Sequence, residues 1–412
     1  MELTRWLPWN FILKWTARRY DFLDPVTVMA RIRQFGQPSE VMEPIELLRA
    51  GLVFHARGVV NTRAIQYNLD WIWPFWVVKQ FSPSDSSFIP RGFSFSHINV
   101  THRNWTMVGQ PDLGIYPIVD PRGLVTPLYD SWSVDAWLLT ESGTLLAPSH
   151  SQNTEQTLEL KKDLQVRTHV HMDGGTVFST ARVAYDLLHN PYLEITAEGL
   201  LEKENGWLLI AVRPYNPEGI SFIDHLSYHA DEKRLQINQD TDLFFSVSPE
   251  KVLLNAYRDS DVAHDLDRTR SDTQLRCPIG MATTAAFFPL DSGQQSCVSC
   301  RIRLDPTAEK TALPGKTQDS SLEMMTSWTA QLEIPDKKFS FLYDAAVSTM
   351  LLLTAQEPFP GPYTYRRFWF RDACLMINAL LGLGLSERSY RHIMNFPNHQ
   401  TFSGYFLSQE GE

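Results

Sequence analysis

Short runs of alternating apolar and polar residues dominate the chain between residues 51 and 304. Two of the clearest runs are residues 157–172, TLELKKDLQVRTHVHM, and residues 192–203, YLEITAEGLLEK. A period of two residues, with many β-branched and aromatic side chains, is typical of half-buried strands. Glycine-containing turns at 173–175 (DGG) and 204–206 (ENG) separate such runs. Many strands with turn-length connections predict a large antiparallel β-sandwich over residues 51–304.

The segments on either side of this region show different patterns. Residues 1–50 predict an N-terminal helical segment, because Asp24 opens an apolar helical spacing and Gly51 follows as a C-cap. Residues 305–338 predict a polar linker that is rich in turn signals and contains one helix at 321–332.

Beyond residue 338 the apolar period becomes helical. Residues 339–412 predict three helices, the second beginning at Asp372 and the third running from Ser386 to Met394. The first of these helices has one apolar face, formed by Phe339, Leu342, Ala346, Met350 and Leu353. The predicted fold class is therefore a multidomain β-then-α protein, with the sheets first and the helices afterwards.

Composition and charge narrow the class of protein. The 412 residues include 37 basic and 47 acidic side chains, a formal net charge of −10, and no dominant basic patch. Neither a nucleic acid nor an anionic membrane is therefore an expected partner. Charges and a proline interrupt the N-terminal sequence, so it lacks the apolar core of a signal peptide, and the longest apolar run, 347–355, is far too short to span a bilayer. These features predict a cytoplasmic protein.

The most chemically distinctive segment is residues 361–385, GPYTYRRFWFRDACLMINALLGLGL. Five aromatic residues lie between Tyr363 and Phe370, and the adjacent pair Arg371-Asp372 follows at the start of a helix. Rings can cover the apolar face of a sugar, while a guanidinium donates to its hydroxyls and a carboxylate accepts from them. A structural alternative is that the aspartate only caps the helix and the arginine only pairs with it.

Here the chain resembles the glucoamylase-like enzymes of glycoside hydrolase family 15. Their pattern is an N-terminal β-sandwich, a helical linker and an (α/α)6 toroid, with a Tyr-x3-Trp-x-Arg-Asp motif between the first two toroid helices. This chain has Tyr365, Trp369, Arg371 and Asp372 at that spacing. The resemblance implies that Arg371 and Asp372 bind hydroxyls of the non-reducing-end sugar, and that Tyr365 and Trp369 line the same subsite. It also implies an inverting, exo-acting hydrolase of α-linked glucans or oligosaccharides that needs neither a metal nor an organic cofactor.

The resemblance covers only the beginning of the expected toroid. A toroid of twelve helices needs about 300 residues or more, so residues 339–412 would be an incomplete one, with the apolar faces of its helices uncovered. We expect the catalytic acid and base, both Glu in this family, to lie beyond residue 412, and the chain to be the N-terminal part of a longer enzyme that is inactive alone. Glu410 and Glu412 are not expected to be that pair.

Two other functions are compatible with the same pattern. A non-catalytic glucoamylase-like protein would use the toroid for sugar sensing or as a scaffold, and a trehalase or debranching enzyme would cut a different bond with the same fold. The sequence leaves open the sugar, the linkage and the oligomeric state.

Cysteine and histidine spacing raises the question of a metal site. Cys277, Cys297 and Cys300, with His264 as a fourth ligand, have part of the spacing of a zinc site, but a single CxxC favours ordinary thiols in a strand. His169 and His171 share one face of a strand, and no carboxylate pattern accompanies them, so we expect a solvent-facing pair. No metal is predicted.

Two further clusters favour structural roles. The rings of Trp71, Trp73, Phe75 and Trp76 do not alternate cleanly, so we expect a packed core or a domain seam more than a sugar platform. A loop-rich region contains four aspartates without the close spacing of a calcium loop, and we interpret them as solvated turns: Asp112, Asp120, Asp130 and Asp135.

Overall fold

The structure is a computed structural model that describes residues 60–61, 63–75, 77, 105–111, 113–160, 164–186, 188–217, 219–269, 271–305, 321–363, 365–406 and 408. The helical segment predicted at 1–50 lies outside these residues, as do Trp76, Asp112, Glu410 and Glu412.

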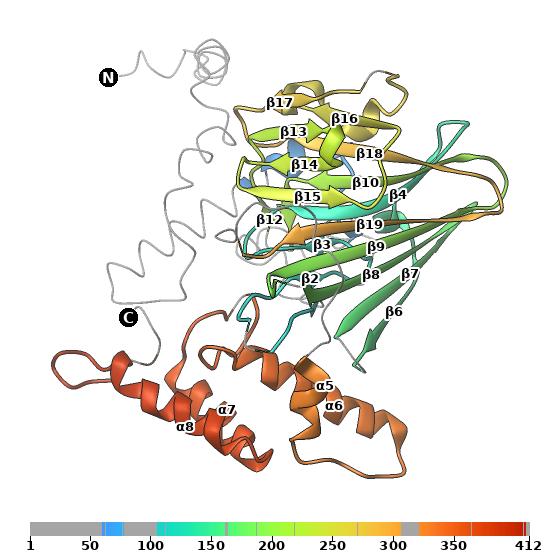
Figure 1. The fold of residues 1–412 in the computed structure, drawn as a ribbon. Helices are drawn as coiled ribbons and strands as arrows, with labels where there is room; N and C mark the ends of the chain where they lie inside the picture. Colours follow the sequence, from blue (N-terminus) through green and yellow to red (C-terminus); the bar gives the residue numbers. More distant parts are fainter. Residues whose placement is uncertain are drawn as a thin grey trace, which may run out of the picture.

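Two stacked sheets and a two-stranded hairpin contain all the named strands of the described residues (Figure 1). The eight-stranded sheet has, in spatial order, β1 (Thr106–Met107), β2 (Ile118–Val119), β3 (Val125–Thr126), β4 (Ser133–Thr140), β10 (Gly206–Arg213), β18 (Thr283–Leu290) and β16 (Lys251–Asn255), with β5 (Leu145–Leu146) paired to β4. The nine-stranded sheet has β17 (Gln274–Arg276), β13 (His225–His229), β14 (Arg234–Ile237), β15 (Thr241–Phe245), β19 (Gln295–Arg303), β9 (Pro191–Leu201), β8 (Gly175–Tyr185), β7 (Gln165–Met172) and β6 (Asn153–Glu159). The hairpin pairs β11 (Tyr215–Asn216) with β12 (Gly219–Ile220). The pairings between these strands are antiparallel, which confirms the predicted β-sandwich.

The two sheets pack closely through an apolar core to which both contribute. A Cβ atom at Gly199 of β9 would come within 2.8 Å of Leu138 on β4 and 3.3 Å of Leu208 on β10. Real Cβ contacts are longer, so a side chain at this position would require Leu138 to shift. Gly199 therefore lets the two layers approach closely at this point.

The two sheets differ in what covers their outer faces. Every residue of β4 is buried, because Leu138 faces the inter-sheet core whereas Trp137 and Leu139 belong to a second apolar cluster on the opposite face. Val262 and Leu266 help to cover that face. In β7 of the other sheet, exposed or partly exposed residues alternate strictly with buried ones. The alternation of apolar and polar residues in 157–172 thus indicates a sheet with one face exposed to solvent.

The sheets are followed by helices, and short 3-10 turns lie between the strands. Among the described residues, the helical elements with complete bounds are η3 (Pro148–His150), η4 (Ala230–Glu232), η5 (Tyr257–Asp259), η6 (Val262–His264), α5 (Ser321–Ser327), α6 (Lys337–Leu353), α7 (Phe370–Gly382), α8 (Ser386–Asn395) and η7 (Phe396–His399). The three helices predicted after residue 338 are present, although α7 begins two residues earlier than expected. Among the described residues, no helix combines the length and the apolarity that a membrane crossing requires.

The predicted apolar face of α6 is wrong in its N-terminal half. Phe339 and Leu342 are 60% and 49% exposed, whereas Val347, Leu351 and Leu352 are buried. The reason is that only the C-terminal half of α6 lies against the sandwich. Exposed apolar side chains also occur on α7 and α8: Leu375, Leu381, Tyr390, Ile393 and Met394.

Tyr116, in the loop before β2, connects the sandwich to the end of α6. Its hydroxyl donates to the carbonyl of Leu352 at 2.9 Å, and burial raises its pKa to about 12. The guanidinium of Arg366 lies over the ring of Tyr116 and donates to the carbonyl of Gly114 at 3.0 Å. The loop between α6 and α7 is therefore fixed to the sandwich by a cation–π contact and hydrogen bonds.

Arg388 of α8 caps the C-terminal end of α6. Its Nη1 donates to the carbonyls of Leu351 and Thr354 at 2.9 and 3.1 Å, and its side chain is almost fully buried. A cation at a helix C-terminus satisfies carbonyls that lack helical partners and interacts favourably with the helix dipole. Helices α6 and α8 are thereby held together at one end.

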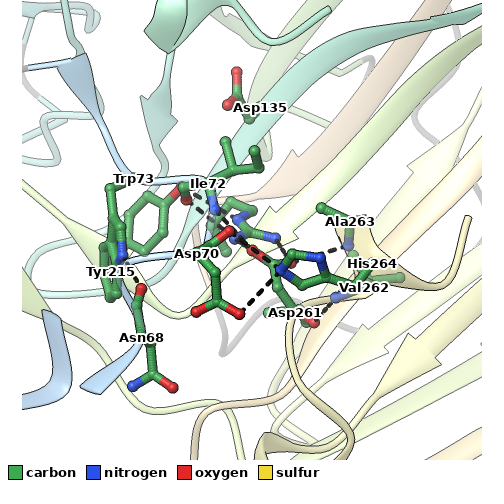
Figure 2. A network of polar contacts seen from close by, with 12 residues as sticks. Asn68, Asp70, Ile72, Trp73, Asp135, Tyr215, Asp261, Val262, Ala263 and His264 are labelled. Atoms are coloured by element: carbon green, nitrogen blue, oxygen red, sulfur yellow. Dashed lines mark hydrogen bonds and ion pairs between the residues drawn. The ribbon is translucent and has the colours of Figure 1, made fainter. Parts of the chain in front are cut away.

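A fully buried ion pair joins β10 to η6 on the outer face of the eight-stranded sheet (Figure 2). The guanidinium of Arg213 contacts both carboxylate oxygens of Asp261, and it also donates to the carbonyl of Ile72 at 3.1 Å. Asp261 in turn accepts from the backbone N–H of Ile72 and from that of Ala263. Burial alone would lower the pKa of Arg213, but the charge of Asp261 raises it above its usual value. The pair ties the segment around Ile72 to the sheet.

We expect Asp261→Ala to reduce the free energy of unfolding by about 3–5 kcal/mol, because it leaves the buried Arg213 charge uncompensated. The control is Glu159→Ala, which removes the partner of Arg167 in a pair whose side chains are 41% and 52% exposed, and should cost about 1 kcal/mol or less. Urea denaturation of both variants measures the difference. Equal effects would contradict a special role for the buried pair.

Asp120 and Asp135 are buried, which corrects their interpretation as solvated turn residues. Asp120 Oδ1 accepts from the backbone N–H groups of Arg122 and Leu124, whereas its Oδ2 is buried without a hydrogen-bond partner. Asp135 Oδ2 accepts from the indole N–H of Trp137 at 2.7 Å. Burial raises the pKa of Asp120 to about 7 and that of Asp135 to about 6. The burial of these two carboxylates could not be predicted from the sequence, because the groups that donate hydrogen bonds to them lie only a few residues away in the chain.

The pKa of Asp120 predicts a stability that falls as the pH rises. An unfolded aspartate has a pKa of about 3.9, so between about pH 4 and pH 7 the unfolded chain loses its proton while the folded protein keeps it. Asp120→Asn keeps the acceptor oxygen and removes the ionisation. We expect the variant to be more stable than the wild type at pH 8, on the order of 1–4 kcal/mol, and its stability to vary less between pH 4 and pH 7.

Thermal unfolding across this pH range tests the prediction. The matched control is Asp186→Asn, because Asp186 makes the same kind of backbone hydrogen bonds in a more exposed turn. The control should retain the wild-type pH dependence. A pH profile of Asp120→Asn identical to that of the wild type would show that Asp120 is ionised in the folded protein at neutral pH.

Candidate functional site

Three of the five rings in the segment 363–370 are used for packing. Tyr363 is buried, with its ring 5.0 Å from that of Tyr129 and 6.0 Å from that of Trp105 in the sandwich. Phe368 and Phe370 pack with residues that follow α8. These three side chains anchor the loop to the rest of the protein.

His399 and Phe396 complete the anchor on the side of η7. The His399 ring stacks on Phe368 at 3.9 Å, and its Nε2 lies 3.1 Å from Oε1 of Glu357. The Phe396 ring lies 4.9 Å from that of Phe370. This support was not predicted from the sequence, because its residues are separated by about 40 positions and have no common motif.

Tyr365 and Trp369 are the two remaining rings, and they contact each other. Their ring centroids are 6.1 Å apart in an edge-to-face arrangement, and Tyr365 is 41% exposed. The indole Nε1 of Trp369 is buried and has no hydrogen-bond partner. A buried donor without a partner is costly, so its presence beside a surface group calls for an explanation.

Arg371 and Asp372 lie in the first turn of α7. Arg371 Nη2 is 3.2 Å from Asp372 Oδ2, and the two side chains are 81% and 26% exposed. The N-cap of α7 is Trp369, and no side chain caps it. The structural alternative was that Arg371 pairs with Asp372 and that Asp372 caps the helix. The ion pair is present, whereas Asp372 makes no capping hydrogen bond.

The structure thus places the ring of Tyr365 against that of Trp369 and the side chain of Arg371 against that of Asp372, both at the start of α7. The four residues provide a charged donor, a carboxylate acceptor and two rings. Two cavities in the described part of the chain are lined by other residues. One, of about 830 Å³, lies between β13, β17 and the turn before β15, and the other, of about 570 Å³, lies between β6, α5 and α6.

The partial zinc set is not brought together. Cys300 is buried between the sheets, while Cys297 is exposed, because positions three apart on β19 point to opposite faces. Cys277 is buried in the inter-sheet core, and His264 Nε2 lies 3.3 Å from Asp70 on the other face of the eight-stranded sheet. Within the described ranges no group of three or more His, Cys, Asp or Glu side chains is arranged to hold a metal ion.

The remaining aromatic and histidine clusters have the structural roles that were predicted. Trp71 and Trp73 are each 3% exposed, and their stacked rings are 6.1 Å apart in an apolar cluster that includes Phe75. His169 and His171 lie on the outward face of β7, where His169 stacks on a neighbouring phenylalanine. These residues do not contribute to the corner at α7.

Comparisons with known proteins give only distant structural likenesses. No protein-family model matches the chain, and no curated protein sequence matches it. A putative kojibiose phosphorylase from the human microbiome has 8% identity and a TM-score of 0.25, covering 66% of this chain and 30% of that one. A family GH92 α-mannosidase from Bacteroides thetaiotaomicron has 10% identity and a TM-score of 0.28, covering 61% and 39% respectively. The chain spans well under half the length of either protein, and likenesses of this strength carry no argument about function.

Proposed function

We propose that the corner formed by Tyr365, Trp369, Arg371 and Asp372 holds the non-reducing-end sugar of an α-linked glucan or oligosaccharide. The helices α6, α7 and α8 would be the first of an (α/α)6 toroid, following the β-sandwich. The protein would act as an inverting, exo-acting glycoside hydrolase. The proposal agrees with the resemblance to the glucoamylase-like enzymes of glycoside hydrolase family 15.

One observation carries this proposal: the rings of the motif divide into two groups. Tyr363, Phe368 and Phe370 pack against other parts of the protein, while Tyr365 and Trp369 contact each other just before the charged pair in the chain. The supported segment thereby presents Arg371, which is 81% exposed and paired with Asp372, at its end.

Each group has a role suited to a sugar. The guanidinium of Arg371 keeps donors beyond the one directed at Asp372, so it can donate to two neighbouring hydroxyls. Asp372 is an acceptor already paired with a cation, which suits hydrogen bonding to hydroxyls better than proton transfer.

Hydrolysis with inversion requires two further carboxyl groups. One, as an acid, protonates the leaving oxygen, and the other, as a base, activates a water on the opposite face of the sugar, with about 6.5–9.5 Å between them. We assign neither role to Arg371 or Asp372. These residues would position the terminal sugar so that such a pair could act on its glycosidic bond.

The proposal predicts that the 412-residue chain binds maltooligosaccharides and that Arg371→Ala weakens binding about 10- to 100-fold. The loss corresponds to a charge-assisted hydrogen bond of about 1.5–3 kcal/mol. Isothermal titration calorimetry with maltopentaose measures it. Arg391→Ala, which removes another exposed arginine from the same group of helices, should bind as the wild type does.

Asp372→Asn removes the negative charge of this side chain but keeps its shape, so it tests the contribution of the charge alone. It keeps an acceptor oxygen but loses the ion pair with Arg371, so we expect an intermediate loss of affinity. Wild-type affinity in both Arg371→Ala and Asp372→Asn, or no binding by the wild-type chain at millimolar sugar, would refute the assignment of the corner.

A further inference from the structure

A tight turn after η7 exposes two aromatic rings that no packing explains. Phe402 is fully exposed and Tyr405 is 72% exposed, whereas Phe406 is partly covered. Single exposed apolar residues are normal, but two on one turn form a small ring surface. No charged residue occurs between Gln400 and Phe406, so the surface is uncharged along its own chain.

Hydrogen bonds hold this turn in one shape. The backbone N–H of Thr401 donates to the carbonyl of Tyr405 at 2.8 Å, and the N–H of Gly404 donates to the carbonyl of Thr401 at 2.8 Å. The side-chain amide of Gln400 donates to the carbonyl of Gly404 at 2.7 Å, and the Thr401 hydroxyl accepts from the N–H of Tyr405. Gly404 has a φ of +87°, which favours glycine at this position. The backbone that carries both rings is therefore preorganised.

The turn is also attached to the start of α7. The ring of Phe406 lies 5.0 Å from that of Phe370, and the backbone N–H of Phe370 donates to the carbonyl of Ser408 at 3.0 Å. Phe370 is the residue between Trp369 and Arg371. The turn is thus attached to the helix start that carries the corner we assign to the terminal sugar.

We propose that Tyr405 and Phe402 form a second sugar-binding platform, which stacks on a further unit of a neutral, linear oligosaccharide whose terminal unit occupies the Arg371–Asp372 corner. This inference rests on the proposed function. An aromatic ring covers the apolar face of a pyranose, and a tyrosine adds a hydroxyl for a hydrogen bond at its polar end. A rigid turn loses little entropy on binding, which suits a subsite that must hold a flexible chain.

The charge of the surface favours a neutral sugar over a phosphorylated one. At the start of α7, Arg371 and Asp372 form a salt bridge of zero net charge. The side chains of the turn itself are hydroxyls, an amide and rings. The turn offers no cationic side chain that could bind a phosphate.

The experiment compares ligands of different length on the full 412-residue chain. Titration calorimetry with maltose and with maltopentaose is carried out on the wild type, Tyr405→Ala and Phe402→Ala. We expect Tyr405→Ala to weaken maltopentaose binding about 3- to 10-fold and to leave maltose binding unchanged, since stacking contributes only for the longer ligand. Tyr405→Phe should retain most of the affinity, because it retains the ring.

Two controls make the result specific. Tyr390 on α8 is 65% exposed, so Tyr390→Ala removes an equally exposed tyrosine outside the turn and should change neither affinity. Melting temperatures of the variants should match that of the wild type, because both substituted rings are exposed.

The outcomes separate this inference from the proposed function. If Arg371→Ala loses binding of both sugars while Tyr405→Ala and Phe402→Ala bind maltopentaose like the wild type, the platform is refuted and the corner stands. If the wild type binds neither sugar, both proposals fail. If the alanine variants instead change the oligomeric state measured by light scattering, the rings are a protein contact and the platform is refuted.

Discussion

The contact between Arg366 and Tyr116 is the constraint on which the candidate site depends. Arg366 belongs to the motif loop and Tyr116 to the sandwich, and the Tyr116 hydroxyl also donates a hydrogen bond to the carbonyl of Leu352 at the end of α6. The loop between α6 and α7 therefore has its position set from the sheet side. Together with the packing of Tyr363 and Phe368, this brace fixes the direction in which a segment with one glycine and three prolines presents Arg371.

The site illustrates how one aromatic-rich segment can serve two purposes. Phe368 contacts His399 and thereby uses a residue from beyond α8, whereas Trp369, its neighbour, faces the corner. Adjacent residues at the entry of a helix point in different directions, so support alternates with the recognition that we propose. Under the proposed function, the corner would be held in position by residues that make no ligand contact.

The local patterns of the sequence were enough to predict the β-sandwich and the three late helices, because alternation and helical period report burial directly. The same reasoning failed where the place of a residue in the periodic pattern does not determine its burial. Phe339 lies on an apolar stripe but is 60% exposed, whereas Asp120 is a polar residue that is buried while the backbone N–H groups of Arg122 and Leu124 donate to its carboxyl oxygen. The four residues of the corner were predicted from a motif. Their supporting contacts, such as Glu357 with His399, could not be, since long-range pairs leave no periodic signal.

The buried pair of Arg213 and Asp261 has a consequence for how this protein can diverge over time. Replacing either residue alone leaves an unpaired charge in the interior. Evolution could therefore replace the pair with apolar residues only through a poorly folded intermediate. The two positions should accordingly change together or not at all among descendants. Because Asp261 also accepts a hydrogen bond from the backbone N–H of Ile72, such a paired replacement would also affect the segment around Ile72 that covers the sheet.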